Sequence, residues 1–249
     1  MIKLAVFDID NTLIDRTEGY IRPSVIDVFE KLKKKGIYCI IATGRTYNII
    51  QKEVLDLQYD YIICGNGTQI ISNDKKIVYE VHIDKETTKL LMNEVKRNND
   101  RMSFEFKSGT FNIGIFELIH KNILSEINLD KELPTVGMGI LEEENVQHYR
   151  NLFPSLDFID AGMIHHYDVV KKGENKKNSL IYLCEKLNII KEEIIAVGDG
   201  VNDIEMIEYA EIGVAMGNAC DELKKIADIV TTSVVEDGIK EVFEKLKII

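Results

Sequence analysis

The stretch IKLAVFDIDNTL, from Ile2 to Leu13, decides how the rest of the chain is interpreted. Its apolar part, Ile2 to Ile9, is short, lacks proline and predicts a β-strand buried on both faces. Asp8 and Asp10 stand at the end of this run, and because side chains alternate along a strand, their carboxylates point the same way. An isolated Asp-x-Asp pair is common by chance. Two like charges at a strand end are costly to bury without compensation, so this pair marks a candidate ligand site.

Similar apolar runs recur along the chain, and helical patterns follow several of them. This alternation predicts a parallel sheet wrapped by helices, which is an α/β fold. The further strands are predicted at Ile37 to Ala42, Tyr61 to Cys64, Ile194 to Val197, Ile212 to Ala215 and Asp228 to Val230. Pro23 suits the first turn of a helix that Gly36 would end. A hairpin is predicted from Gln69 to Ile71 and Ile77 to Val81.

The pattern changes from about residue 83 to 170, where longer polar helices mix with alternating strands. This change predicts an inserted α+β domain over 83–170, with a core formed by 1–82 and 171–249. Two linkers near Val81 and Val170 would form its hinge. The predicted elements of the insert are strands at Ser103 to Phe106 and Phe111 to Phe116 and helices at Lys85 to Arg97, Glu117 to Ile127 and Glu142 to Leu152.

Composition restricts the partners of the protein. The 249 residues, 45% of them hydrophobic, are enough to bury a core, and a formal net charge of −11 argues against duplex DNA or an anionic membrane surface as a partner. The chain has no run of eighteen apolar residues and no signal-peptide pattern, so we expect a soluble, cytoplasmic protein. The four cysteines lie far apart and predict neither disulfides nor a zinc site.

Three more segments place polar groups where ligands bind in parallel α/β folds. Thr43 offers a hydroxyl and Gly44 permits close approach of the backbone. A helix is predicted to follow from Tyr47, and Thr43 is also a plausible N-cap of that helix. The loop GDGVND, from Gly198 to Asp203, follows a predicted strand, and its alternative role is an Asx-rich turn. Lys176 directly precedes the apolar stripe of a helix, where phosphate-binding groups gather, and its alternative role is a solvated lysine.

Together, DIDNTL (8–13), ATGR (42–45), Lys176 and GDGVND resemble, in this order, the haloacid dehalogenase superfamily of phosphotransferases. The segments similar to its Cof-type branch are CGNGTQI (64–70), IEM (204–206), VAMGNA (214–219), ADIVT (227–231) and EDGI (236–239). The resemblance covers about 1–82 and 171–249. It implies a Rossmann-like parallel sheet with helices on both faces and a C2-type cap. Asn11 and Lys177 depart from the glycines common at these positions.

The resemblance also implies a role for each candidate residue. Asp8 would attack phosphorus to form an aspartyl phosphate, and Asp10 would protonate the leaving oxygen and then activate water. Mg²⁺ would be held by the Asp8 carboxylate, the Asp10 backbone carbonyl and Asp199.

The remaining candidates would bind the phosphoryl group. Thr43, with the backbone at Gly44, and Lys176 would hold its oxygens, and Asn202 would assist. Asp203 would either bind the metal directly or only orient Lys176 or a metal-bound water. Positioning and charge stabilisation would carry most of the catalysis.

We therefore expect a Mg²⁺-dependent phosphatase of small phosphorylated metabolites, sugar phosphates first, with specificity residing in 83–170. A phosphosugar mutase, in which a sugar hydroxyl receives the phosphoryl group, is the enzymatic alternative. A phospho-acceptor domain is the non-enzymatic one, and the length of the insert and the GDGVND loop argue against it. His165 and His166 are expected to be ordinary linker residues. The sequence carries no indication of oligomeric state.

Overall fold

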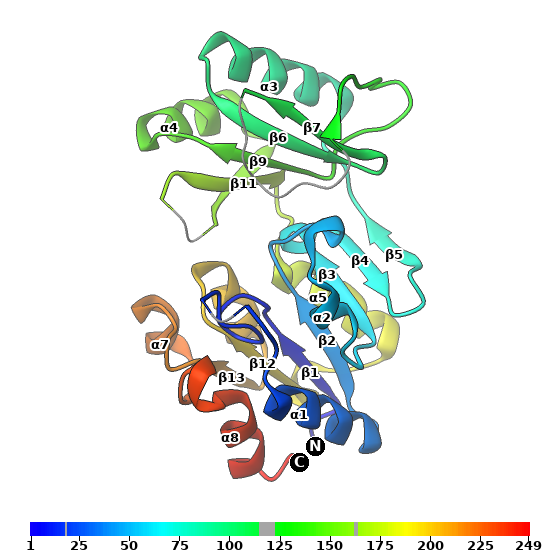
Figure 1. The fold of residues 1–249 in the computed structure, drawn as a ribbon, viewed down its shortest axis with the longest axis vertical. Helices are drawn as coiled ribbons and strands as arrows, with labels where there is room; N and C mark the ends of the chain where they lie inside the picture. Colours follow the sequence, from blue (N-terminus) through cyan, green and yellow to red (C-terminus); the bar gives the residue numbers. More distant parts are fainter. Residues whose placement is uncertain (18, 115–122, 162–163) are drawn as a thin grey trace.

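The computed structural model describes residues 1–17, 19–114, 123–161 and 164–249, which form two β-sheets (Figure 1). The first sheet has eight strands in the order β14-β13-β12-β1-β2-β3-β4-β5. These strands are β1 Leu4–Phe7, β2 Tyr38–Ala42, β3 Tyr61–Cys64, β4 Gln69–Ser72, β5 Ile77–Glu80, β12 Ile194–Gly198, β13 Ile212–Ala215 and β14 Ile229–Val230. Pairing is parallel from β14 to β3, and β4 and β5 add an antiparallel hairpin. The predicted α/β fold with a parallel sheet is confirmed.

The strand β1 lies between β12 and β2 in the middle of the first sheet. All four of its residues are fully buried, which explains the uninterrupted apolar run. Phe7 is in register with Val197 on one side and Ile41 on the other. The strand ends two residues before the predicted Ile9, because the chain turns there and the Ile9 carbonyl accepts hydrogen bonds from the next turn. Asp8 therefore lies just beyond the carboxyl end of the strand.

Helices cover both faces of the first sheet. They are α1 Pro23–Lys34, α2 Lys52–Leu55, α5 Lys176–Leu187, α6 Ile204–Tyr209, α7 Asp221–Ile226 and α8 Gly238–Lys245. The Phe7 ring joins α1 and α8 to one face, with its centroid 5.0 Å from that of Phe29 and 5.5 Å from that of Phe243. Figure 1 shows α1 and α8 in front of the strands and α5 behind them. None of the helices within the described ranges is long and apolar enough to span a bilayer.

The second sheet has six strands in the order β10-β11-β9-β6-β7-β8. They are β6 Arg101–Phe106, β7 Gly109–Ile113, β8 Ile123–Leu124, β9 Val136–Ile140, β10 Leu156–Asp160 and β11 His166–Lys171. The helices α3 Lys85–Arg97 and α4 Glu143–Leu152 cover the face that points away from the first sheet (Figure 1). Leu91, Val146, Phe104 and Val169 belong to one apolar cluster beneath these helices, separate from the core of the first sheet.

Some predicted elements differ from the structure. The predicted helix from Glu117 to Ile127 falls partly on residues 115–122, which lie outside the described residues, as does the end of the strand predicted from Phe111 to Phe116. In the described part, Ile123–Leu124 form β8 and pair in parallel with β7, so the helical prediction is wrong there. Short apolar runs occur in both helices and strands, and here pairing with β7 favours the strand.

Two smaller differences concern local structure. The helix predicted from Tyr47 is a single 3₁₀ turn over Tyr47–Ile49, followed by α2. His166 is the first residue of β11 and is in register with Ile140, so it is a strand residue rather than part of a linker.

The chain crosses between the two sheets at two places. Going out, the Val81 N–H bonds to the Thr68 carbonyl beside the first sheet, and the Ile83 N–H bonds to the Pro134 carbonyl beside the second. On return, β11 keeps its pairing with β10 up to Lys171, and α5 begins at Lys176.

The buried face of α1 gives a test of the core. Leu32 is fully buried, whereas Ile26 on the same helix is 44% exposed. We expect Leu32→Ala to lower the free energy of unfolding by about 2–5 kcal/mol, because it removes buried methyl groups and leaves a cavity. Ile26→Ala should cost less than about 1 kcal/mol. Equilibrium unfolding in urea measures both values, and equal losses would contradict the assigned core face.

Candidate active site

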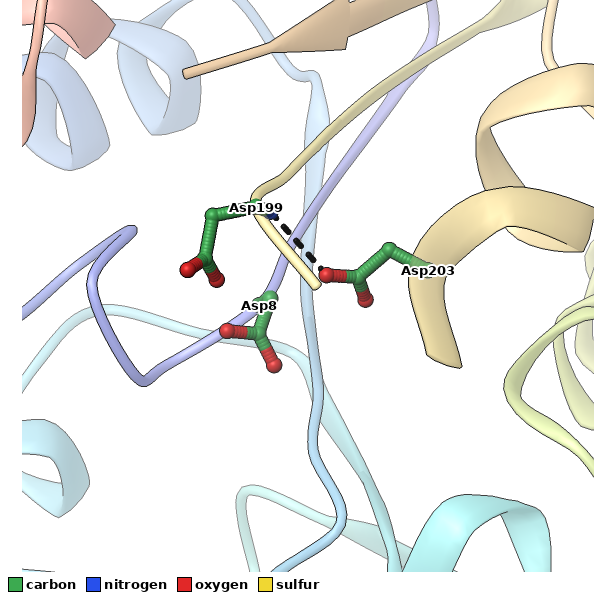
Figure 2. A group of neighbouring side chains, drawn as sticks. All are labelled: Asp8, Asp199 and Asp203. Atoms are coloured by element: carbon green, nitrogen blue, oxygen red, sulfur yellow. Dashed lines mark hydrogen bonds between the residues drawn. The ribbon is translucent and has the colours of Figure 1, made fainter. Parts of the chain in front are cut away.

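Three carboxylates meet at the carboxyl edge of the first sheet. Asp8 follows β1, Asp199 follows β12, and Asp203 ends the 3₁₀ turn Val201–Asp203. Because β1 and β12 are parallel neighbours, their ends bring Asp8 and Asp199 together. One carboxylate oxygen from each of the three residues lies within 4.8 Å of the others (Figure 2). The structure thus groups three of the predicted site residues.

Asp203 is fully buried, and both of its oxygens accept hydrogen bonds within the protein. Oδ2 accepts the backbone N–H groups of Asp199 at 3.1 Å and Gly200 at 3.0 Å, and Oδ1 accepts from the Lys176 Nζ. A Cβ at Gly198 would lie 2.6 Å from the Asp203 Cγ, so this loop requires glycine there. Asp203 shapes the loop that carries Asp199, which suits an orienting role better than a ligand role.

Lys176 is the first residue of α5, and its side chain is buried. The helix is capped by Asn175, whose side chain accepts the Asn178 N–H. The Lys176 Nζ donates to Asp8 Oδ1 at 2.7 Å and to Asp203 Oδ1 at 2.7 Å. Burial acts to lower the pKa of Lys176, but the two carboxylates outweigh it and raise this pKa. Lys176 is therefore a permanent cation beside Asp8.

The site has too little positive charge for its carboxylates. Burial, together with the neighbouring aspartates, raises the pKa of Asp8 well above its usual value despite Lys176. Burial and the charge of Asp203 raise the pKa of Asp199 to about 6. A divalent cation would supply the missing charge, and carboxylate oxygens are the ligands that hard cations prefer. The donor set therefore fits a divalent metal.

Asp10 is hydrogen bonded to two arginines. Arg45 donates to both carboxylate oxygens, from Nε to Oδ2 at 2.8 Å and from Nη2 to Oδ1 at 2.6 Å, and the Arg16 Nε donates to Oδ1 at 3.1 Å. Burial acts to raise the pKa of Asp10, but these hydrogen bonds and charges outweigh it and lower this pKa. Arg45 lies in the ATGR segment, but the sequence predicts no role for it or for Arg16.

Thr43 and Gly44 lie at the end of β2, next to Asp8. Thr43 is buried, and its Oγ1 accepts the Arg45 N–H at 3.1 Å, which leaves the hydroxyl hydrogen to donate elsewhere. The residue that caps the following 3₁₀ turn is Thr46, so Thr43 is not its N-cap. A Cβ at Gly44 would lie 3.0 Å from Asp168 Oδ2, so a side chain at this position would crowd that carboxyl group.

Asn202 is hydrogen bonded to Asn66, a residue to which the sequence assigned no role. Its Nδ2 donates to Asn66 Oδ1 at 2.9 Å, and Asn66 Nδ2 donates to Asp168 Oδ2 at 2.6 Å. Burial raises the pKa of Asp168 to about 7, and the hydrogen bond from Asn66 and the charge of Lys176 oppose that rise. The CGNGTQI segment carried a signal for Asn66, whereas nothing in the sequence pointed to Asp168.

Comparison with known proteins identifies the family of the chain. The family model of the haloacid dehalogenase-like hydrolases matches residues 5–243. A Streptococcus pyogenes protein, named as a candidate bifunctional phosphatase and peptidyl-prolyl cis-trans isomerase, is 29% identical over 271 residues, which cover 100% of this chain and 54% of that protein. The chain thus spans about half the length of this relative.

Solved structures share the whole fold. BT1666 of Bacteroides thetaiotaomicron, from a study of phosphatases of this superfamily, superposes with a TM-score of 0.91 at 26% identity, over 100% of this chain and 96% of that one. The sugar phosphatase BT4131 of subclass IIB superposes with a TM-score of 0.89 at 27% identity, over 99% and 100%. With a family match over nearly its full length, the chain belongs to the haloacid dehalogenase-like hydrolases and is a phosphoric monoester hydrolase.

Proposed function

We propose that the chain is a Mg²⁺-dependent phosphatase that hydrolyses small phosphorylated metabolites, sugar phosphates first, through an aspartyl phosphate on Asp8. The observation that carries this proposal is the environment of Asp8. One oxygen of its buried carboxylate accepts a hydrogen bond from Lys176, and the carboxylates of Asp199 and Asp203 lie close to it. The sugar phosphatase named above supports the choice of sugar phosphates.

The reaction would use the side chains in two steps. The Asp8 oxygen that does not contact Lys176 attacks phosphorus, the bond to the leaving oxygen breaks, and Asp10 gives that oxygen a proton. A bound Mg²⁺ would offset the charge of Asp8, Asp199 and the phosphoryl group. Asp10 then takes a proton from water as the water attacks phosphorus. The bond between phosphorus and the Asp8 oxygen breaks, which releases inorganic phosphate and restores the Asp8 carboxylate. Lys176, Thr43 and Asn202 would hold the phosphoryl oxygens in both steps.

The two arginines on Asp10 set a condition on this mechanism. They lower its pKa, whereas a group that both donates and accepts a proton works best with a pKa near the working pH. A phosphoryl group entering beside Asp10 brings negative charge, which raises the pKa of a neighbouring carboxyl. Substrate binding would thereby prepare Asp10 for proton transfer.

We assign residues 83–170 as a C2-type cap on a core formed by 1–82 and 171–249. Two hydrogen bonds join the second sheet to the first near the site: Asn48 Nδ2 donates to Glu105 Oε1 at 2.6 Å, and Asn66 donates to Asp168. The face of the second sheet that is opposite α3 and α4 would lie over the leaving group. Cap side chains would then select the leaving group, while the core binds phosphate.

The nucleophile is tested by Asp8→Asn. We expect kcat to fall by at least about a thousandfold, because the amide is isosteric but does not attack phosphorus. Asp74→Asn, in the exposed turn of the β4–β5 hairpin, is the control and should keep wild-type kcat. Circular dichroism checks that both variants are folded. If folded Asp8→Asn retained more than about a tenth of wild-type kcat, the covalent mechanism would be wrong.

The metal and the substrate class are tested with a panel of phosphoesters. Chelation should abolish turnover, Mg²⁺ should restore it, and Ca²⁺ should support it poorly because its looser shell misplaces the phosphoryl oxygens. Mg²⁺ should also raise the Tm of the wild type but not that of Asp199→Asn. Sugar phosphates should give the highest kcat/KM, with free sugar and phosphate as products.

Three outcomes of this panel contradict the proposal. Full activity in chelator would exclude the metal. An isomeric sugar phosphate as product would identify a mutase. Phosphopeptides or 5′-phosphorylated oligonucleotides that outperform every small phosphoester would exclude the substrate class.

The pH dependence of kcat/KM tests the role of Asp10. Arg45 lowers the pKa of Asp10, so Arg45→Ala should raise it. If protonated Asp10 donates to the leaving oxygen, activity falls as pH rises through this pKa, and the fall should move to higher pH in Arg45→Ala. Arg16→Ala removes one hydrogen bond rather than two and should move it less. An alkaline limb that stays in place, or moves to lower pH, would exclude Asp10 as the acid.

A further inference from the structure

The loop over residues 65–67 is held in an unusual backbone conformation. Gly65, Asn66 and Gly67 all have positive φ, at 56°, 51° and 106°. A residue with a side chain rarely takes this conformation, and it persists where the surroundings enforce it. Glycine and asparagine are the residues that adopt this left-handed conformation most readily, so the backbone favours both at position 66 and does not by itself distinguish them.

This loop is wedged between the cap and the helix that carries Lys176. A Cβ at Gly65 would lie 2.6 Å from Val136 Cγ2 on β9, and a Cβ at Gly67 would lie 2.3 Å from the carbonyl oxygen of Asn175. The Ser179 Oγ also donates to the Gly67 carbonyl. The position of Asn66 is therefore fixed from both sides.

The Asn66 amide uses its two ends in opposite directions. Its Nδ2 donates to Asp168 of the cap, and its Oδ1 accepts from Asn202 of the core, while the residue is only 1% exposed. Asp168 Oδ2 accepts the hydrogen bond from Asn66 Nδ2, so an oxygen acceptor at this position sets which end of the Asn66 amide faces the cap. In this orientation the Asn66 amide oxygen faces Asn202, so Asn202 must donate an N–H to it.

The orientation of Asn66 therefore also sets the orientation of the Asn202 amide. Its Oδ1 lies over Gly200, 2.8 Å from the position of a Cβ there, and one N–H is used by Asn66. Within the described ranges, the structure shows no protein acceptor for the second N–H of Asn202. This donor is suited to an anionic phosphoryl oxygen, whereas a flipped amide would present its carbonyl oxygen instead.

We propose that Asp168 and Asn66 are positioning residues that aim an N–H donor of Asn202 at the phosphoryl group. The chain Asp168–Asn66–Asn202 links the cap to phosphate binding, so the donor is oriented only when 83–170 sits on the core. This inference rests on the proposed function, since it assumes that Asn202 binds phosphate.

A double-mutant cycle separates positioning from a structural role. Asn66→Gly removes the amide but keeps the left-handed backbone. We expect Asn66→Gly and Asn202→Ala each to lower kcat/KM about tenfold, and Asn66→Gly/Asn202→Ala should be no worse than Asn202→Ala alone. The inhibition constant of inorganic phosphate should rise in parallel. Losses that multiply in the double variant would overturn the proposal.

The cap end of the chain is tested in the same way. Asp168→Ala should lower kcat/KM only when Asn202 is present, whereas Asp168→Asn keeps an oxygen for Asn66 and should restore most of the activity. Asn48→Ala is the matched control, because it breaks another side-chain hydrogen bond between cap and core, the one to Glu105. Its effect should be independent of Asn202. Equal effects of Asp168→Ala and Asn48→Ala in the Asn202→Ala background would show that both contacts only hold the cap.

The outcomes distinguish this inference from the proposed function. If the wild type hydrolyses no phosphoester in the presence of Mg²⁺, the proposed function is wrong. If the wild type is active and the cycle is additive, only the positioning role is wrong. Should Asn66→Gly fail to fold, the comparison of Asp168→Ala with Asp168→Asn decides.

Discussion

One buried ammonium, that of Lys176, allows the carboxyl edge of the first sheet to exist in its observed form. Asp8 and Asp203 both contact it, and without it these two buried carboxylates would lack a neighbouring cation. The compensation is incomplete, since the pKa values of Asp8 and Asp199 remain raised. A site built with a deficit of positive charge favours binding of a cation, and the family to which the chain belongs carries out chemistry that such a cation assists.

The two sheets contribute differently to this edge. The first supplies fixed positions, because β1 is buried and paired on both sides. The second sheet supplies two side chains, Glu105 and Asp168, that reach across to core asparagines. Polar contacts of this kind align the second sheet with the core. Breaking them costs little free energy, unlike breaking a continuous apolar interface.

The parts of the site that follow buried strands were predictable from the sequence. Apolar runs located β1, β2 and β12, and the rule that parallel strands end at a common edge brought Asp8, Thr43 and Asp199 together. The position of Lys176 was also predictable from local sequence, because it directly precedes the apolar stripe of α5 and lies in the first turn of that helix. Strand ends were less certain, since β1 stops at Phe7 where the chain turns.

The contacts between distant side chains were not predictable. Asn66 meets Asp168 across 102 positions and Asn202 across 136, and no local pattern encodes such a pair. Arg16 and Arg45 were visible as residues, but their hold on Asp10 depends on how two loops pack. The strand β8 was missed because its pairing with β7, rather than its own composition, determines its conformation.

The register of β1 with β12 also bears on how the molecule assembles. Leu4 pairs with Ile194, so most of the chain lies between the two strands at the centre of the first sheet. Joining them early would close a very long loop at a high cost in entropy. The second sheet pairs mostly between nearby segments and has its own apolar cluster, so it can form first and shorten that loop. In this order of events, the inserted segment helps its host to fold by bringing the two halves of the first sheet within reach of each other.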